Sequence, residues 1–217
     1  MSINESSIIG DAFVRSYGSA AAIKKPLSLI TTHLQGDAKF KDLLKKQVDG
    51  AEPFFDFPSI ASSALIHAFH SSVVCEILFF EYRELFKKHT ISLAPLMFTR
   101  HLLEGGIVMN LQNCCVFMSG TAASTLLDEK QREKIKSVFA EHFPKLIDAR
   151  DALAHEHDRA VGKYRDERIS DVGQSTNSVE SGIAGLIDKS GVKFDFDFSS
   201  SKIIALTEQL VEIICKA

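Results

Sequence analysis

FPSIASSALIHAFHSSVVC, residues 57–75, is the stretch that decides the fold, because it runs for 19 residues without Asp, Glu, Lys or Arg. That length is close to what a helix needs to cross a membrane. Five serines and two histidines interrupt the stretch, however, and Glu76 and Glu81 follow it at once. We therefore interpret it as a helix in the core of a bundle and not as a membrane span.

Further helices are expected on both sides of this stretch. The long helix itself is predicted from about Pro58 to Lys88, since proline suits a first helical turn and lysines suit a last one. A second helix is expected from Pro95 to about Phe117, and its Gly105-Gly106 pair is typical of close helix packing. A charged amphipathic helix is predicted over 128–142, and Pro144 opens another one.

The two ends of the chain differ from this central part. One helix is expected from Ser7 to about Leu34, broken or kinked at Pro26, followed by a short amphipathic helix over 37–48. Near the other end, IAGLID and VKFDFDF are separated by KSG, a pattern that predicts a β-hairpin. Residues 199–201, all serine, can cap a final helix that runs to Lys216.

These patterns predict a mainly α protein, a helical bundle with a small β-hairpin arm before the C-terminal helix. We expect a single domain over 1–217. Its expected parts are an N-terminal helical extension over 1–50, core helices over 58–158, an irregular arm over 162–200 and the C-terminal helix over 201–216.

Composition narrows the classes of function. The net charge of −3 gives no general attraction to nucleic acid, so any RNA contact needs a local basic patch. The four cysteines lack C-x-x-C spacing, and we expect buried thiols in a reducing compartment. The N-terminus has no signal-peptide pattern, so we expect a cytoplasmic protein that does not contact a membrane.

The segment with the strongest functional signal is ARDALAHEHDR, residues 149–159. Four residues separate Arg150 from His155, and His157 is an alternative partner. Spacing alone is weak evidence, because YRELFKKH places Arg83 and His89 at a comparable distance. What distinguishes the first segment is the polar Asp151 after the arginine, the small apolar Ala-Leu-Ala, and the polar run that follows.

This segment resembles the R-x4–6-H signature of HEPN domains, which are helical nucleotide-binding or RNA-cleaving domains. The wider arrangement is similar to bacterial HEPN proteins of the abortive-infection type. The resemblance implies a homodimer in which two copies of the motif meet across a cleft. It also implies RNA as a substrate and an antitoxin protein as a partner, as in a toxin-antitoxin system.

The chemistry that the resemblance implies is a metal-independent endoribonuclease without a cofactor. His155, or His157 in its place, would act as base or acid in attack of a ribose 2′-hydroxyl on the adjacent phosphate, and Arg150 would stabilise the charge on phosphorus. Asp151 lies four residues before His155, within reach to orient the imidazole.

Helix geometry gives His155 and His157 different directions relative to Arg150. On a regular helix, Arg150 and His155 point about 140° apart, whereas Arg150 and His157 differ by only about 20°. Two chains or a broken helix end must therefore bring Arg150 and His155 together.

The basic residues after the motif and an aromatic stripe before the last helix each have two interpretations. Four basic residues after the motif could guide a phosphate backbone towards it, or could form a solvated loop balanced by acidic neighbours: Arg159, Lys163, Arg165 and Arg168. The aromatic stripe over 194–198, FDFDF, could stack on bases, but packing of an edge strand on the helices explains it more simply.

Metal binding is a further alternative. His67-x-x-His70 and His101-x-x-Glu104 place pairs one turn apart on neighbouring helices, and Glu76 and Glu81 lie near in sequence. Histidines in or at the edge of the core are the simpler interpretation. Three functions therefore stay open: an RNA-cleaving defence or toxin protein, a non-catalytic interaction or nucleotide-binding module, and a metal-binding bundle.

Overall fold

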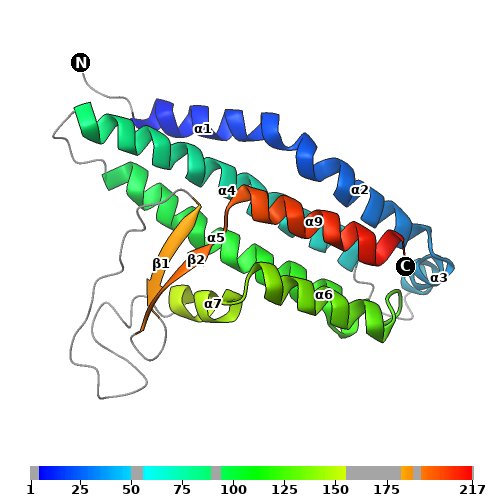
Figure 1. Cartoon of the computed structure of the whole chain (residues 1–217). Coiled ribbons are helices and arrows are strands. Elements are labelled where there is room, and N and C mark those ends of the chain that lie inside the picture. Colours follow the sequence, from blue (N-terminus) through cyan, green and yellow to red (C-terminus); the bar gives the residue numbers. More distant parts are fainter. Residues whose placement is uncertain (1–4, 50–55, 89–93, 155–181, 188–191, 217) are drawn as a thin grey trace.

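The computed structural model describes residues 5–49, 56–88, 94–154, 182–187 and 192–216. This part of the chain is mainly helical and carries one two-stranded hairpin before the last helix, which confirms the predicted fold class (Figure 1). The helices are α1 (Glu5–Ser19), α2 (Ala21–Gly36), α3 (Ala38–Val48), α4 (Phe57–Lys88), α5 (Ala94–Ser119), a 3-10 turn (Thr121–Ala123), α6 (Glu129–His142), α7 (Leu146–Ala154) and α9 (Ser200–Cys215).

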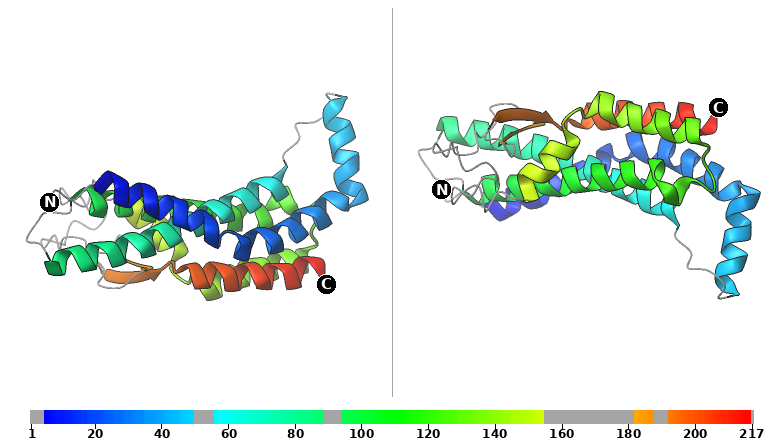
Figure 2. Two further views of the ribbon diagram at one scale, coloured as in Figure 1. Left: turned by 90° about the horizontal axis from the view of Figure 1, so that it is seen from above. Right: turned by 90° about the horizontal axis from the view of Figure 1, so that it is seen from below.

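The two long helices α4 and α5 run antiparallel at the centre of the bundle, and the other elements pack around them. Helix α1 lies along α4, α2 contacts both α4 and α9, and α6 contacts both α5 and α9. Helix α7 packs against α5 and against the hairpin. Helix α3 projects from one end of the bundle (Figure 2). The motif helix thus lies between α5 and the first strand of the hairpin.

Helix α4 is a core helix, as its apolar sequence predicts. Leu65, Ala68 and Phe69 are fully buried and belong to one continuous core with residues of α2, α5, α6, α7, the hairpin and α9. Among the described residues, one helical stretch, Phe57–Leu85, is long and apolar enough to cross a membrane, but half of its most apolar window is buried against other helices. That burial is what a bundle core requires.

The N-terminal segment differs from the prediction at one point. Instead of one helix interrupted at Pro26, the chain forms α1 and α2 with a break at Ala20, and Pro26 lies inside α2. Ala20 is itself buried, and Ile23 and Leu27 of α2 face the core. The break lets α1 follow α4 while α2 turns towards α9 (Figure 1). The break therefore lies where α2 leaves the course of α1 and reaches α9.

The predicted hairpin is present as β1 (Ile183–Ile187) and β2 (Lys193–Asp197), which pair antiparallel. The KSG turn lies largely outside the described residues. Alternation along β2 sends Phe194 and Phe196 into the core, and Phe198 after the strand is also buried. The base-stacking interpretation of this stripe is therefore wrong, since these rings are covered by the protein itself.

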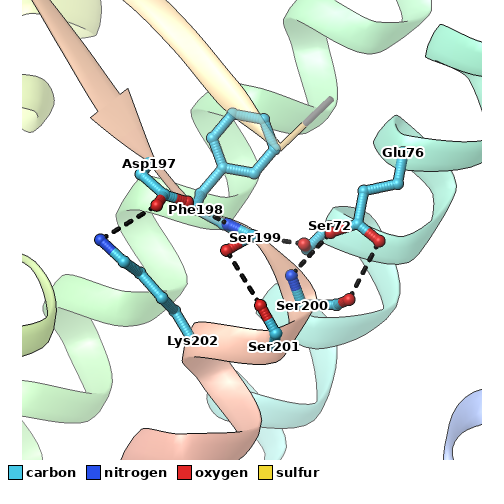
Figure 3. Close-up of polar contacts among 8 residues, drawn as sticks. All are labelled: Ser72, Glu76, Asp197, Phe198, Ser199, Ser200, Ser201 and Lys202. Carbon is cyan, nitrogen blue, oxygen red and sulfur yellow. Dashed lines mark hydrogen bonds and ion pairs between the residues drawn. The ribbon is translucent and has the colours of Figure 1, made fainter. Parts of the chain in front are cut away.

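The start of α9 is capped by a residue far away in sequence. Ser199 occupies the N-cap position, but its side chain makes no capping hydrogen bond. Instead the Glu76 carboxylate accepts hydrogen bonds from Ser200 N at 2.7 Å and from Ser200 Oγ at 2.9 Å (Figure 3). Ser72 Oγ donates to the Phe198 carbonyl oxygen at 2.8 Å. A carboxylate suits a helix N-terminus, so α4 holds the chain where the hairpin leads into α9.

Gly182, directly before β1, should tolerate no side chain. Its φ is +76°, and a Cβ built there would lie 3.0 Å from Ser199 Cα. We expect Gly182→Ala to lower the free energy of unfolding by about 1–3 kcal/mol, measured by urea denaturation followed by circular dichroism. Gly10→Ala is the matched control: nothing lies near Gly10 on α1, and this change should stabilise the protein by about 0.5–1 kcal/mol. Equal effects of the two substitutions would contradict this description of the junction.

Candidate functional site

Helix α7 presents the motif arginine on its outer face. Three residues of α7 are buried against the core, namely Leu146, Ala149 and Ala152. The small apolar residues of the motif therefore let α7 pack closely against α5 and the hairpin. Arg150 falls between the buried positions, and its side chain is 39% exposed. The helix thus holds Arg150 where a solvent-borne ligand can reach it.

Asp151 is engaged with Arg150. Asp151 Oδ1 lies 3.0 Å from Arg150 Nε and 2.6 Å from Arg150 Nη2, so it accepts two charge-assisted hydrogen bonds. A guanidinium carries five N–H donors, and this contact uses only part of them. The structure brings these two motif residues together, and Asp151 orients the Arg150 guanidinium. The expected contact of Asp151 with His155 stays a prediction, because His155 lies outside the described residues.

The other predicted site residues lie outside the described part of the chain. Helix α7 ends at Ala154, directly before His155. His157 and the four basic residues Arg159, Lys163, Arg165 and Arg168 follow in the same undescribed range, 155–181. Their expected roles stay predictions.

The second arginine with similar spacing, Arg83, has a different setting. It is exposed on the long helix α4, near a surface ion pair in which Lys87 Nζ lies 2.7 Å from Glu84 Oε1. Its expected partner His89 lies outside the described residues. Arg83 therefore offers a matched control for experiments on Arg150.

The histidine pair on α4 does not form a metal site with its neighbours. His67 is exposed, and the His70 ring lies 5.0 Å from the Tyr17 ring. Burial, with the nearby positive charge of Lys24, lowers the pKa of His70. A lysine beside the imidazole also opposes a bound cation, so His70 is best described as a histidine at the edge of the core.

The acidic residues of the metal-binding alternative have other partners. Glu76 caps α9, Glu81 forms an exposed ion pair with Arg15 at 3.3 Å, and Glu104 pairs with Arg100. Within the described ranges, no group of three or more His, Cys, Asp or Glu side chains is placed to hold a metal ion. These residues therefore give no support to the metal-binding alternative.

A buried ion pair on α5 is the polar feature that the sequence did not reveal. Arg100 Nε lies 3.0 Å from Glu104 Oε1, and these residues are only 4% and 9% exposed. Arg100 Nη2 donates to the Ile183 carbonyl oxygen of β1 at 2.8 Å, and the guanidinium carbon lies 5.2 Å from the centre of the Phe79 ring. The one sequence feature that could have indicated this pair is that Arg100 and Glu104 are the sole Arg, Lys, Asp or Glu residues of α5 and lie one turn apart.

The cysteines do not form a reactive site. All four are free, Cys75 and Cys114 are buried, and Cys115 and Cys215 are partly buried. Burial raises the pKa of each thiol. A raised pKa keeps the thiol protonated and unreactive near neutral pH, which agrees with the expected structural role.

Searches of protein-family models, of characterised proteins and of solved structures find no match to this chain.

Loss of the Glu104 charge should lower the free energy of unfolding more than loss of a surface charge does. We expect Glu104→Gln to lower the free energy of unfolding by about 3 kcal/mol, because it leaves the Arg100 guanidinium buried without its counter-charge. Glu81→Gln, which breaks an exposed ion pair, should cost less than about 1 kcal/mol. Thermal and urea unfolding compare the two variants, and a Glu104→Gln protein as stable as Glu81→Gln would show that the buried pair is not important.

Proposed function

We propose that this chain is an RNA-cleaving protein of the HEPN type that acts without a metal ion. The observation that carries the proposal is the placement of Arg150. It lies on α7, partly exposed and oriented by Asp151. The histidines of the motif follow directly in sequence.

The proposed reaction uses each of these side chains for one task. Arg150 would bind the non-bridging oxygens of a phosphate with two hydrogen bonds and stabilise the charge that develops there. His155, or His157, would take the proton of the 2′-hydroxyl as O2′ attacks phosphorus. The bond from phosphorus to O5′ breaks, and O5′ takes up a proton. The products are a 2′,3′-cyclic phosphate and a 5′-hydroxyl end.

RNA binding would depend on local charge, since the chain as a whole is acidic with a net charge of −3. The basic residues after the motif would supply that charge by contacting phosphates. In this proposal two copies act together, so that the arginine of one motif can serve the histidine of either copy, and an antitoxin protein would restrain the activity.

A non-catalytic nucleotide-binding or interaction module is the second candidate. The contact of Arg150 with Asp151 favours it, because a neighbouring carboxylate reduces the positive charge offered to a phosphate. This candidate predicts binding at the same face without cleavage.

Substitution of the motif arginine tests the proposal. In the presence of EDTA, the purified protein should cleave single-stranded RNA, and Arg150→Ala or His155→Ala should lower the rate by at least about 100-fold. Arg150→Lys should recover little activity, since an ammonium cannot make the two-pronged contact. His157→Ala, measured beside His155→Ala, identifies the histidine that acts.

The control is Arg83→Ala, which removes an exposed arginine of similar sequence spacing and should keep full activity. Circular dichroism establishes that each variant is folded. Cleavage that survives in Arg150→Ala, or that Arg83→Ala lowers equally, contradicts the catalytic assignment. RNA binding without cleavage by the unmodified protein would favour the second candidate.

A further inference from the structure

Helices α2 and α3 concentrate positive charge in a chain that is acidic as a whole. Residues 21–48 contain six lysines, two aspartates and no arginine or glutamate, whereas the whole chain has a net charge of −3. Helix α2 contains no Asp or Glu, and α3 contains only Asp42. The six lysines are all exposed and together form the lysine surface: Lys24, Lys25, Lys39, Lys41, Lys45 and Lys46.

Acidic neighbours balance little of this charge. Among the described residues, one ion pair involves the lysine surface, and it joins Lys46 Nζ to Asp42 Oδ2 at 3.2 Å. Lys41 and Lys45 lie four positions apart on α3, where two like charges repel each other and destabilise a helix. A bound polyanion would remove that repulsion.

Helix α6 shows how the same chain arranges charge on an ordinary exposed helix. It carries four Lys or Arg residues, as many as α3, but it also carries three glutamates. Lys130 and Lys134 each follow directly after a glutamate, Glu129 and Glu133. Mixed signs of this kind are typical of a face that only has to be solvated. The lysine surface lacks this mixing, which indicates a ligand of negative charge.

The lysine surface is long and accessible. Helix α3 projects from the end of the bundle away from the hairpin, and α2 leads from α1 to this end (Figure 1 and Figure 2). From Lys24 to Gly36, α2 is about 18 Å long, and the four lysines of α3 follow beyond it. A chain of many negative charges can contact both helices at once, whereas a single small anion cannot.

An exposed aromatic ring lies at the α2 end of the lysine surface. Tyr17 of α1 is 68% exposed, and Lys24 Nζ lies 6.0 Å from the centre of its ring. On its other neighbour, the Tyr17 ring is 5.0 Å from the ring of His70. An aromatic ring that is open to solvent beside a cation can stack on an unpaired base while the cation contacts the adjacent phosphate.

We infer that the lysine surface and Tyr17 bind single-stranded RNA, with the lysines on phosphates and the Tyr17 ring on a base. The choice of RNA among polyanions rests on the proposed function. The site itself is a different one, since α3 lies at the end of the bundle away from the hairpin on which α7 packs (Figure 1). Contacts to phosphates and to one base face do not depend on sequence, so this surface would hold RNA without selecting a target.

Two other kinds of polyanion fit this surface less well. A helix that binds an anionic membrane buries its apolar side chains in the lipid, but Phe40 of α3 is only 4% exposed, because the protein itself covers it. An acidic protein is a weaker candidate because lysine is depleted at protein–protein interfaces. Neither alternative uses the exposed ring of Tyr17 beside Lys24, whereas RNA has a base for the ring and a phosphate for the lysine.

Binding of an RNA that cannot be cleaved through its 2′-hydroxyls tests the lysine surface. The probe is a fluorescent single-stranded RNA with a 2′-O-methyl group on every ribose, and fluorescence anisotropy with the full-length protein in EDTA measures the dissociation constant. Lys41→Glu/Lys45→Glu should raise this constant by at least about 10-fold and reduce its dependence on salt, lowering the slope of log K against log salt by about 1–2. Lys130→Glu/Lys134→Glu makes the same charge change at the same spacing on α6 and should alter the constant by less than about 3-fold.

Substitution of Tyr17 tests the stacking contact separately. Tyr17→Ala should weaken RNA binding by about 5-fold or more, and Tyr17→Phe should retain the affinity, since the ring and not the hydroxyl contacts the base. Circular dichroism establishes that each variant is folded. A Tyr17→Ala protein with unchanged affinity overturns the stacking contact.

Three results overturn the inference as a whole. They are an unmodified protein that does not bind this RNA, an affinity that the α3 and α6 variants lower equally, and tighter binding to phosphatidylserine vesicles or to polyglutamate than to RNA. RNA binding that depends on Lys41 and Lys45, in a protein that leaves ordinary RNA intact, supports the inference and counts against the proposed function alone. Cleavage of ordinary RNA by a protein whose binding ignores the α3 variant counts against the inference alone.

Discussion

The buried ion pair between Arg100 and Glu104 is the constraint on which the rest of the structure depends. Two charges inside a helical bundle are tolerated when they are paired, and here Glu104, the Ile183 carbonyl oxygen and the Phe79 ring surround the guanidinium. The pair therefore joins α5 to α4 and to the first strand of the hairpin. It also fixes the rotation of α5 about its own axis, since any other rotation would expose one of these charges. The attachment of the first hairpin strand to α5 follows from the same side chain.

The motif helix is built on this frame. Helix α7 contacts both α5 and β1, the two elements that the Arg100 guanidinium joins, and its small residues allow a close approach to them. Arg150 consequently lies on a helix that packs against the core, with Asp151 orienting its guanidinium from the next position. Support of this kind favours a group whose task is to hold a phosphate in one geometry.

Local patterns in the sequence were sufficient to predict most of the helices and the hairpin. Contacts between residues far apart in the chain could not be predicted from such patterns. Helical periodicity and turn residues predicted the long core helix, the hairpin and the last helix, because these signals act over a few residues. The break at Ala20 was missed because it depends on which partners α1 and α2 pack against, and Pro26 gave a stronger local signal. The cap on α9 comes from Glu76, 124 positions before Ser200, and Arg100 contacts Ile183 across 83 positions, so no local pattern could show either contact. At the site, sequence identified Arg150 and Asp151 but did not show that they bind each other; the expected histidines and basic residues remain predictions.

The proposed chemistry has a signature in the substrate that needs no change in the protein. RNA that carries a 2′-deoxyribose at one position lacks the attacking hydroxyl there, while its phosphates and bases are unchanged. Incubation of such an RNA with the unmodified protein in EDTA, followed by mapping of the cleavage sites and analysis of the new ends, tests the mechanism directly. Attack by the 2′-hydroxyl predicts no cleavage at the phosphate following the deoxyribose, and 2′,3′-cyclic phosphate and 5′-hydroxyl ends elsewhere. Cleavage at the deoxy position, or products that carry 3′-hydroxyl and 5′-phosphate ends, would contradict it.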